Sequence, residues 1–193
     1  FAEDPYLIGI ESAHYIKGMH NLMGSQFNLG NYQKLNATLK DFEKFCNSKI
    51  VLQNHNNLIQ CFIYHTISQL NKHFLTGNFS DGLLLVEGIE EKLKEYEIYL
   101  DWHRILVIYY KIASMYFGTG NYETAIDYLN KIINWKVDLR NDLQCYARLL
   151  HLIAHYELGN YQLLEYLAKS VYRFMAKMQN LSVVEEEMFK FLR

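Results

Sequence analysis

The stretch IASMYFGTGNYETA, residues 112–125, decides the fold, because it places Gly120-Asn121-Tyr122 between two apolar segments of helical periodicity. Glycine adopts the left-handed backbone conformation that ends one helix, and an asparagine side chain caps the first turn of the next. The aromatic residue that follows is placed to pack back between the two helices. The stretch therefore predicts a helical hairpin.

The same phrase, a Gly-Asn pair followed by an aromatic residue, occurs four times in the chain. It lies at residues 30–32, 77–79, 120–122 and 159–161, so that successive glycines are 47, 43 and 39 residues apart. A repeat of about 40 residues is typical of solenoids built from helical hairpins. The sequence therefore predicts an all-α solenoid of four antiparallel hairpins.

The composition agrees with long helices. Only one of the 193 residues is proline, which breaks helices more strongly than any other residue, and 15% are aromatic. Disordered chains contain fewer aromatic residues and collagen-like chains contain far more glycine and proline, so both classes are excluded. A chain of this length is also long enough to bury the core of one domain.

The hydrophobic periodicity sets the expected bounds of the helices. We expect hairpins at about 5–46, 58–96, 101–135 and 141–178, and a terminal helix at 182–193. These make about nine helices in a single domain over residues 1–193, with a polar loop at 47–57. The chain begins without methionine and ends within the last helix, so we expect a fragment of a longer protein.

The third hairpin resembles a tetratricopeptide repeat over about residues 102–135. The residues that match this family in order and spacing are Ile112-Ala113, Tyr116, Gly120, Tyr122 and Ala125. The other hairpins match less closely, because Leu35 and Gly82 stand where the family has alanine and the spacings exceed its period of about 34 residues. The resemblance implies a right-handed solenoid whose first helices line a concave face.

That concave face is the expected binding surface. Its candidate residues are Tyr64, Ile67 and Asn71 in the second hairpin, Val107, Tyr110, Ser114 and Phe117 in the third, and Tyr146, Leu149 and Ile153 in the fourth. Tyrosine combines a large apolar body with a polar tip, which suits recognition surfaces. The alternative is that these residues pack against a neighbouring repeat or against parts of the protein outside this chain.

The chemistry of this face indicates an apolar or amphipathic partner segment. Members of the family that grip acidic peptide tails use a lysine and an asparagine one helical turn apart. The corresponding pairs here are Tyr110 with Ser114, Leu149 with Ile153, and Ile67 with Asn71, and they contain no lysine. We therefore expect a protein or peptide partner and no carboxylate clamp.

No motif in the sequence indicates catalysis. His151 and His155 share a helix face at the spacing of metal ligands, but they lack a third ligand and the glutamate of a zinc protease. Cys61 and His65 have the same spacing without an electropositive setting that would form a thiolate. Phosphate-binding, nucleophile-elbow and CxxC motifs are absent from the sequence. We expect no enzyme activity, no cofactor and no metal.

Charge and cysteine content restrict partner and compartment. Nineteen basic and twenty-one acidic residues give a net charge of −2, which provides no electrostatic attraction to nucleic acid or anionic membranes. No apolar run approaches the roughly 18 residues of a membrane-spanning helix. Three scattered cysteines are typical of a reducing compartment, which favours a cytoplasmic protein.

Two functional interpretations follow from the sequence. The first is a non-catalytic scaffold that binds a protein or peptide through its concave, aromatic and apolar groove. The alternative is a peptide-sensing or dimerising segment of a larger bacterial signalling or transcription-regulatory protein, which leaves a homodimer open.

Overall fold

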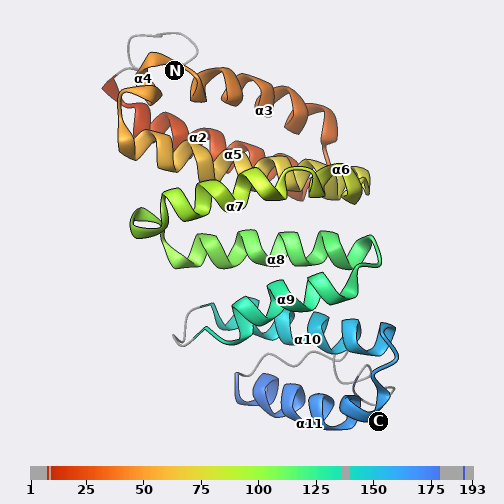
Figure 1. The fold of residues 1–193 in the computed structure, drawn as a ribbon. Helices are drawn as coiled ribbons and strands as arrows, with labels where there is room; N and C mark the ends of the chain where they lie inside the picture. Colours follow the sequence, from red (N-terminus) through yellow and green to blue (C-terminus); the bar gives the residue numbers. More distant parts are fainter. Residues whose placement is uncertain (1–7, 9, 136–139, 179–188, 190–193) are drawn as a thin grey trace. The chain divides into compact units, whose positions relative to one another are not determined.

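The computed structural model describes residues 8, 10–135, 140–178 and 189, and every regular element within them is a helix (Figure 1). The predicted all-α class is confirmed for this part of the chain. The chain divides into two compact units, Phe1–Leu100 and Asp101–Arg193. Within each unit, neighbouring helices pack as hairpins, whereas the joining of all four hairpins into one solenoid domain stays a prediction.

The first unit contains the first two hairpins. Its helices are α2 (Ser12–Asn28), α3 (Tyr32–Cys46), α4 (Lys49–Leu52), α5 (His55–Thr76), α6 (Phe79–Leu83) and α7 (Val86–Glu95), followed by the 3₁₀ turn η1 (Glu97–Tyr99). Helices α2 and α3 form the first hairpin, and α5 packs against both of them. The predicted start of the first helix at Pro5 lies outside the described residues.

The second unit contains the other two hairpins. Its helices are α8 (Trp102–Gly118), α9 (Tyr122–Ile133), α10 (Asn141–Glu157) and α11 (Tyr161–Lys177). Figure 1 shows α8 and α9 as a hairpin, and α10 packs against both of these helices and against α11. The predicted terminal helix 182–193 lies outside the described residues except for Phe189, which is buried.

The structure corrects two expected bounds in the first unit. The polar stretch 47–57 is not a plain loop, because it contains α4, which buries Val51, and the first turn of α5, capped by Asn54. The expected helix after the second turn is divided into α6 and α7 by a turn at Leu84 and Leu85, just after Gly82. The Leu84 and Leu85 amides bond to carbonyls three residues earlier, at 3.3 and 3.2 Å. Glycine has no side chain to favour the helix, which fits a local tightening to 3₁₀ geometry.

The four turn glycines adopt the predicted conformation. Gly30, Gly77, Gly120 and Gly159 have φ angles of 65°, 65°, 79° and 73°. The asparagine after each of the first three caps the next helix, since its side-chain oxygen accepts a hydrogen bond from the backbone amide three residues on. Asn160 differs, because its side-chain nitrogen lies 3.0 Å from Nδ1 of His155. The sequence phrase therefore ends one helix and starts the next, as predicted.

Aromatic side chains pair across the turns. The residue two positions after the turn glycine packs edge-on against the aromatic ring three positions before it. The measured pairs are Phe74 with Phe79 at 5.5 Å between ring centroids, Phe117 with Tyr122 at 5.2 Å, and Tyr156 with Tyr161 at 5.9 Å. Edge-on packing of two aromatic rings contributes stabilisation beyond the burial of the rings themselves. Each pair therefore helps to hold the two helices of its hairpin together at the turn.

All four hairpins bury the same positions, counted from their turn glycines. The residues 14 and 7 before the glycine and 5, 9 and 12 after it are buried in every hairpin. They are Ile16, Met23, Leu35, Leu39 and Phe42; Ile63, Leu70, Gly82, Val86 and Ile89; Leu106, Ala113, Ala125, Leu129 and Ile132; and Cys145, Leu152, Leu164, Ala168 and Val171. These intervals follow the helical period, so each helix turns one apolar stripe inward.

Candidate partner-binding site

The predicted binding residues of the second unit form two adjoining rows. The rows, named here the α8/α10 stripe, consist of Val107, Tyr110, Ser114 and Phe117 on α8 and Tyr146, Leu149 and Ile153 on α10. Intervals of three and four residues place each row on one face of its helix, and α10 packs against α8. Between the two rows, the structure places Tyr110 of α8 close to Tyr146 of α10.

The centre of the stripe is the Tyr110 hydroxyl. Burial raises the pKa of Tyr110, a hydrogen bond with the Ser114 side chain lowers it, and the nearby Tyr146 raises it further. The Ser114 hydroxyl also donates to the Tyr110 backbone oxygen at 2.8 Å. The phenol of Tyr110 thus lies close to side chains of both helices and is protonated at neutral pH.

The stripe is accessible in the second unit. Tyr146 exposes 46% of its surface, and the other six side chains are half-buried. Leu149 also packs against the hydrophobic cluster that includes Phe189, and the Phe117 ring rests on Tyr122. Leu149 and Phe117 are therefore held by contacts within the second unit, and part of each side chain remains exposed.

The predicted binding residues of the first unit are placed differently. Tyr64, Ile67 and Asn71 lie on one face of α5 and are buried, with 6%, 8% and 6% of their surfaces exposed. The Tyr64 ring is stacked on His20 of α2, with ring centroids 4.0 Å apart and planes 12° apart. The burial of these three residues favours the alternative interpretation, in which the row packs against a neighbouring repeat, and Tyr64 does so against α2.

The two histidines of α10 do not form a metal centre with other described residues. The rings of His151 and His155 lie 4.6 Å apart, but no third ligand from the described histidine, cysteine, aspartate and glutamate residues joins them. Burial lowers the pKa of His151 to about 4, with smaller effects from His155 and Arg148. Burial also lowers the pKa of His155. Both imidazoles are therefore neutral at pH 7.

The structure places Cys61 and His65 among buried and partly buried neighbours on α5. Cys61 is buried and hydrogen-bonds with the Cys46 thiol, and this contact, followed by burial, raises the pKa of Cys46. Burial lowers the pKa of His65, whose ring lies 6.5 Å from Phe42. The Cys61 thiol therefore contacts the thiol of Cys46, and the His65 imidazole is neutral at pH 7.

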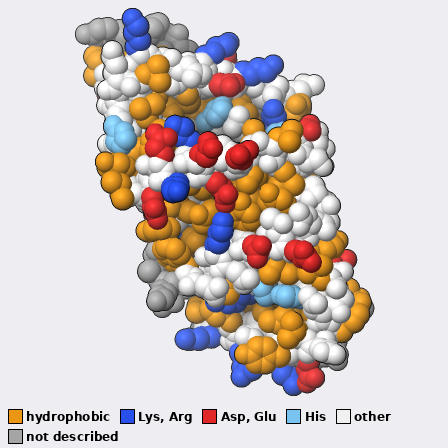
Figure 2. Space-filling view, viewed as in Figure 1, with side chains coloured by type: hydrophobic (Ala, Val, Ile, Leu, Met, Phe, Trp, Pro, Cys, Tyr) orange, Lys and Arg blue, Asp and Glu red, His pale blue; other side chains and the backbone are white. Residues whose placement is uncertain are grey.

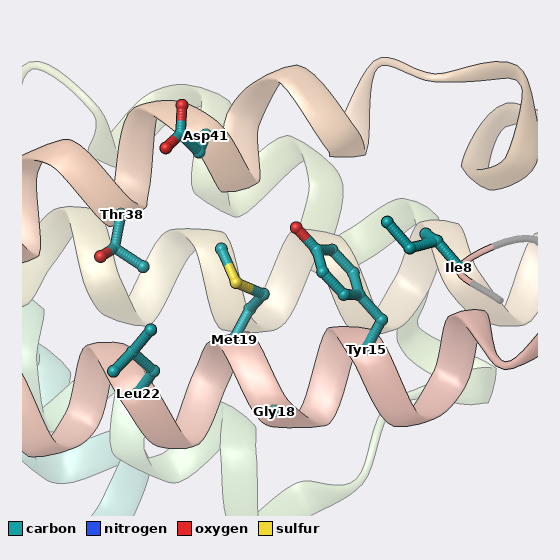
Figure 3. A pocket seen from close by; sticks show the side chains of 7 residues that line it. All are labelled: Ile8, Tyr15, Gly18, Met19, Leu22, Thr38 and Asp41. Atoms are coloured by element: carbon teal, nitrogen blue, oxygen red, sulfur yellow. The ribbon is translucent and has the colours of Figure 1, made fainter. Parts of the chain in front are cut away.

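A hollow that the sequence did not reveal lies between α2 and α3 (Figure 3). Its volume is about 420 Å³, and its lining is mostly apolar. The lining residues are Ile8, Tyr15, Gly18, Met19, Leu22, Thr38 and Asp41. The sequence signal was small side chains, Gly18 on α2 and Thr38 on α3, at positions where the third hairpin has Ile108 and Tyr128.

The visible charged surface is mixed in sign. Figure 2 shows acidic and basic side chains interleaved over α7, among hydrophobic ones. Lys92 and Glu95 form one ion pair there, at 2.6 Å. None of the helices in the described part of the chain combines the length and apolar character needed to span a bilayer.

Comparison with protein families, with curated proteins and with solved structures gives no match to this chain. The interpretation of its surfaces therefore rests on the packing, exposure and chemistry of the residues themselves.

Proposed function

We propose that this chain is a non-catalytic binding module whose α8/α10 stripe receives an apolar or amphipathic segment of a partner protein. The observation that carries the proposal is the closeness of the half-buried Tyr110 of α8 to the exposed Tyr146 of α10, each in a row of half-buried side chains. Anchored aromatic side chains that remain accessible lose little conformational entropy on binding, so they are effective in recognition.

A tetratricopeptide-like solenoid is the proposed architecture around this surface. Four turns with left-handed glycines and one shared pattern of buried positions support it. The packing within each unit supports it as well: α5 contacts both helices of the hairpin before it, and α10 does the same. In repeat proteins, contacts of this kind between successive hairpins build the continuous core.

The stripe favours an apolar segment over an acidic tail. The side chains of its two rows are aliphatic or aromatic apart from the Ser114 hydroxyl, which is engaged with Tyr110. A partner that places a leucine or phenylalanine between the rows buries apolar area worth about 25 cal/mol per Å². The phenols of Tyr110 and Tyr146 supply hydrogen bonds to the partner.

Photo-crosslinking in cells tests this function. A photoreactive phenylalanine analogue at position 146 should crosslink the intact protein to a partner, whereas the same analogue at Tyr166, which is 70% exposed on α11, should not. Tyr146→Ala should then weaken binding of the identified partner at least about tenfold, or about 1.4 kcal/mol. Equal crosslinking at both positions, or unchanged affinity, would contradict the proposal.

A further inference from the structure

The hollow between α2 and α3 lies on a seam that every hairpin has. The seam, named here the outer seam, is formed by the residues 12 and 11 before the turn glycine and 8 and 11 after it. In the first hairpin these are Gly18 and Met19 on α2 and Thr38 and Asp41 on α3, and all four line the hollow (Figure 3). The side chains at these four positions differ among the hairpins, and this difference indicates which kind of chemical group fits the hollow.

In the third hairpin the outer seam is filled by its own side chains. The same four positions hold Ile108, Tyr109, Tyr128 and Lys131. The two tyrosine rings are 5.9 Å apart, and the Lys131 ammonium lies 4.2 Å from the centroid of the Tyr128 ring. The hollow in the first hairpin therefore arises because glycine, methionine and threonine replace three large side chains.

In the second and fourth hairpins, the first helix of the seam packs against the second helix of the preceding hairpin. His65 of α5, 12 residues before its turn glycine, faces the Phe42 ring of α3. On α10, Gln144 donates to the Ile132 backbone oxygen of α9 at 2.7 Å, and Arg148, 11 residues before the turn glycine, donates to the Ile133 oxygen at 3.3 Å. Each covering element is the second, amphipathic helix of a hairpin.

We propose that the outer seam of α2 and α3 is a docking site for an amphipathic helix of a partner protein. The helix lies against α2 as α3 lies against α5 and as α9 lies against α10. It inserts a bulky apolar side chain into the 420 Å³ hollow, in contact with Met19 and with Leu22, which is 47% exposed in the present structure. This site is separate from the α8/α10 stripe and lies in the other unit.

The rim of the hollow adds a charge preference. Asp41 is the acidic residue of the lining, whereas the third hairpin has Lys131 at this position. Asp41 pairs with Lys44 at 3.2 Å, but both side chains are largely exposed, so this pair contributes little and can be exchanged. A lysine or arginine beside the inserted apolar side chain therefore suits the partner helix.

A second copy of the chain is a poorer occupant than a partner helix. A copy would have to offer the second helix of a hairpin with its apolar face free. Among the described residues, that face of α3 packs on α5 and that of α9 packs on α10, while the buried face of α11, with Leu164, Val171 and Met175, belongs to a cluster that contains Phe189. The apolar residues of α7, such as Ile89, are likewise buried.

A peptide with the sequence of α9 and its caps, residues 121–135, tests the site, because α9 is one of the helices that cover an equivalent seam. Methionine methyl groups in the intact 193-residue chain serve as reporters in an NMR titration. We expect the Met19 methyl signal to shift saturably, while Met115 and Met175, buried in the second unit, keep their positions. A short helix must order on binding, so the expected Kd is about 10 µM to 1 mM.

Gly18→Leu is the decisive variant, with Gly88→Leu on α7 as its matched control. Both glycines are exposed and lie inside helices, and a Cβ at either meets no heavy atom within 4 Å, so both variants should fold. Filling the hollow at position 18 should weaken peptide binding at least about tenfold, and the control should bind as the wild type does. Circular dichroism verifies that both retain their helix content.

Three outcomes would overturn the proposal. The first is a Met19 signal that does not respond to the peptide, and the second is equal binding by Gly18→Leu and the wild type. The third is a Met19 shift that follows protein concentration without peptide, which would identify a second copy as the occupant. The same peptide extended by two lysines should bind the wild type more tightly than it binds Asp41→Asn. Equal binding would show that the partner helix needs no basic residue beside Asp41.

Discussion

The two units of this chain share one pattern of buried positions but differ in which face of their hairpins is open. In the first unit the face of α5 with Tyr64, Ile67 and Asn71 is closed, whereas the outer seam of α2 and α3 is hollow. In the second unit the α8/α10 stripe is accessible and the outer seam of α8 and α9 is filled by tyrosines. A hairpin repeat therefore fixes which residues are buried in its core, while side-chain size outside that core decides which surfaces stay open.

The largest expected effect on stability comes from replacing a tyrosine of the buried row and comparing it with a tyrosine of the accessible row. Tyr64→Ala removes a buried ring stacked on His20, so we expect a loss of about 2–4 kcal/mol in the free energy of unfolding. Tyr146→Ala removes an exposed ring and should cost less than about 1 kcal/mol. Urea unfolding followed by circular dichroism measures both. Similar losses for the two variants would show that the two rows are not packed differently.

A smaller effect is expected from the half-buried His151 of the second unit. The pKa of His151 falls from 6.5 to about 4 on folding, so between these pH values the unfolded chain binds more protons than the folded one. Its contribution to stability is therefore complete above pH 6.5 and is lost as the pH falls toward 4. Because the ring is partly solvated, we expect this contribution to the free energy of unfolding to be about 1–2 kcal/mol.

Urea unfolding of the wild type and of His151→Gln between pH 7 and pH 4 measures this contribution. The variant should lose less stability than the wild type across that range. Burial also lowers the pKa of His65 in the first unit, and this histidine is present in both proteins. Its titration therefore contributes the same pH dependence of stability to both curves. Parallel curves for the two proteins would contradict the assignment to His151.

The smallest effect concerns the hollow itself. Gly18→Ala places a methyl group where no heavy atom lies within 4 Å and removes a flexible residue from a helix interior. We therefore expect the variant to be about 0.5–1 kcal/mol more stable, as measured by thermal unfolding. Gly120→Ala is the contrasting control, because its φ of 79° strains any side chain and should make that variant less stable. A destabilised Gly18→Ala would indicate that the seam is more tightly packed than the structure shows.

Most of the fold was predictable because it depends on local signals. Gly120 with Asn121 ends one helix and caps the next through contacts within a few residues, so the turns and the bounds of α8 to α11 follow from the sequence. The short helix α4 and the break after Gly82 were not predicted. Their helical propensity is weak, and the burial of residues such as Val51 supplies the remaining stabilisation.

The candidate site was predictable only in part. Helical spacing placed Tyr64 and Tyr110 in equivalent rows, and the structure keeps both rows on single helix faces. Whether a row is open depends on the neighbouring helix, and the first helix carries His20 at the position where it stacks on Tyr64. That contact joins residues 44 positions apart, so no local pattern reveals it.

The sequence by itself determined the helices, the turns and the residues that each hairpin buries, because these follow from the helical period and from the backbone preferences of glycine and asparagine. Only the tertiary structure decided which surfaces stay open. The hollow beside Gly18 and the covering of Tyr64 depend on side chains from separate helices meeting, or failing to meet, in space. The volume left between two helices is a property of the pair, and a periodic pattern along one helix does not contain it.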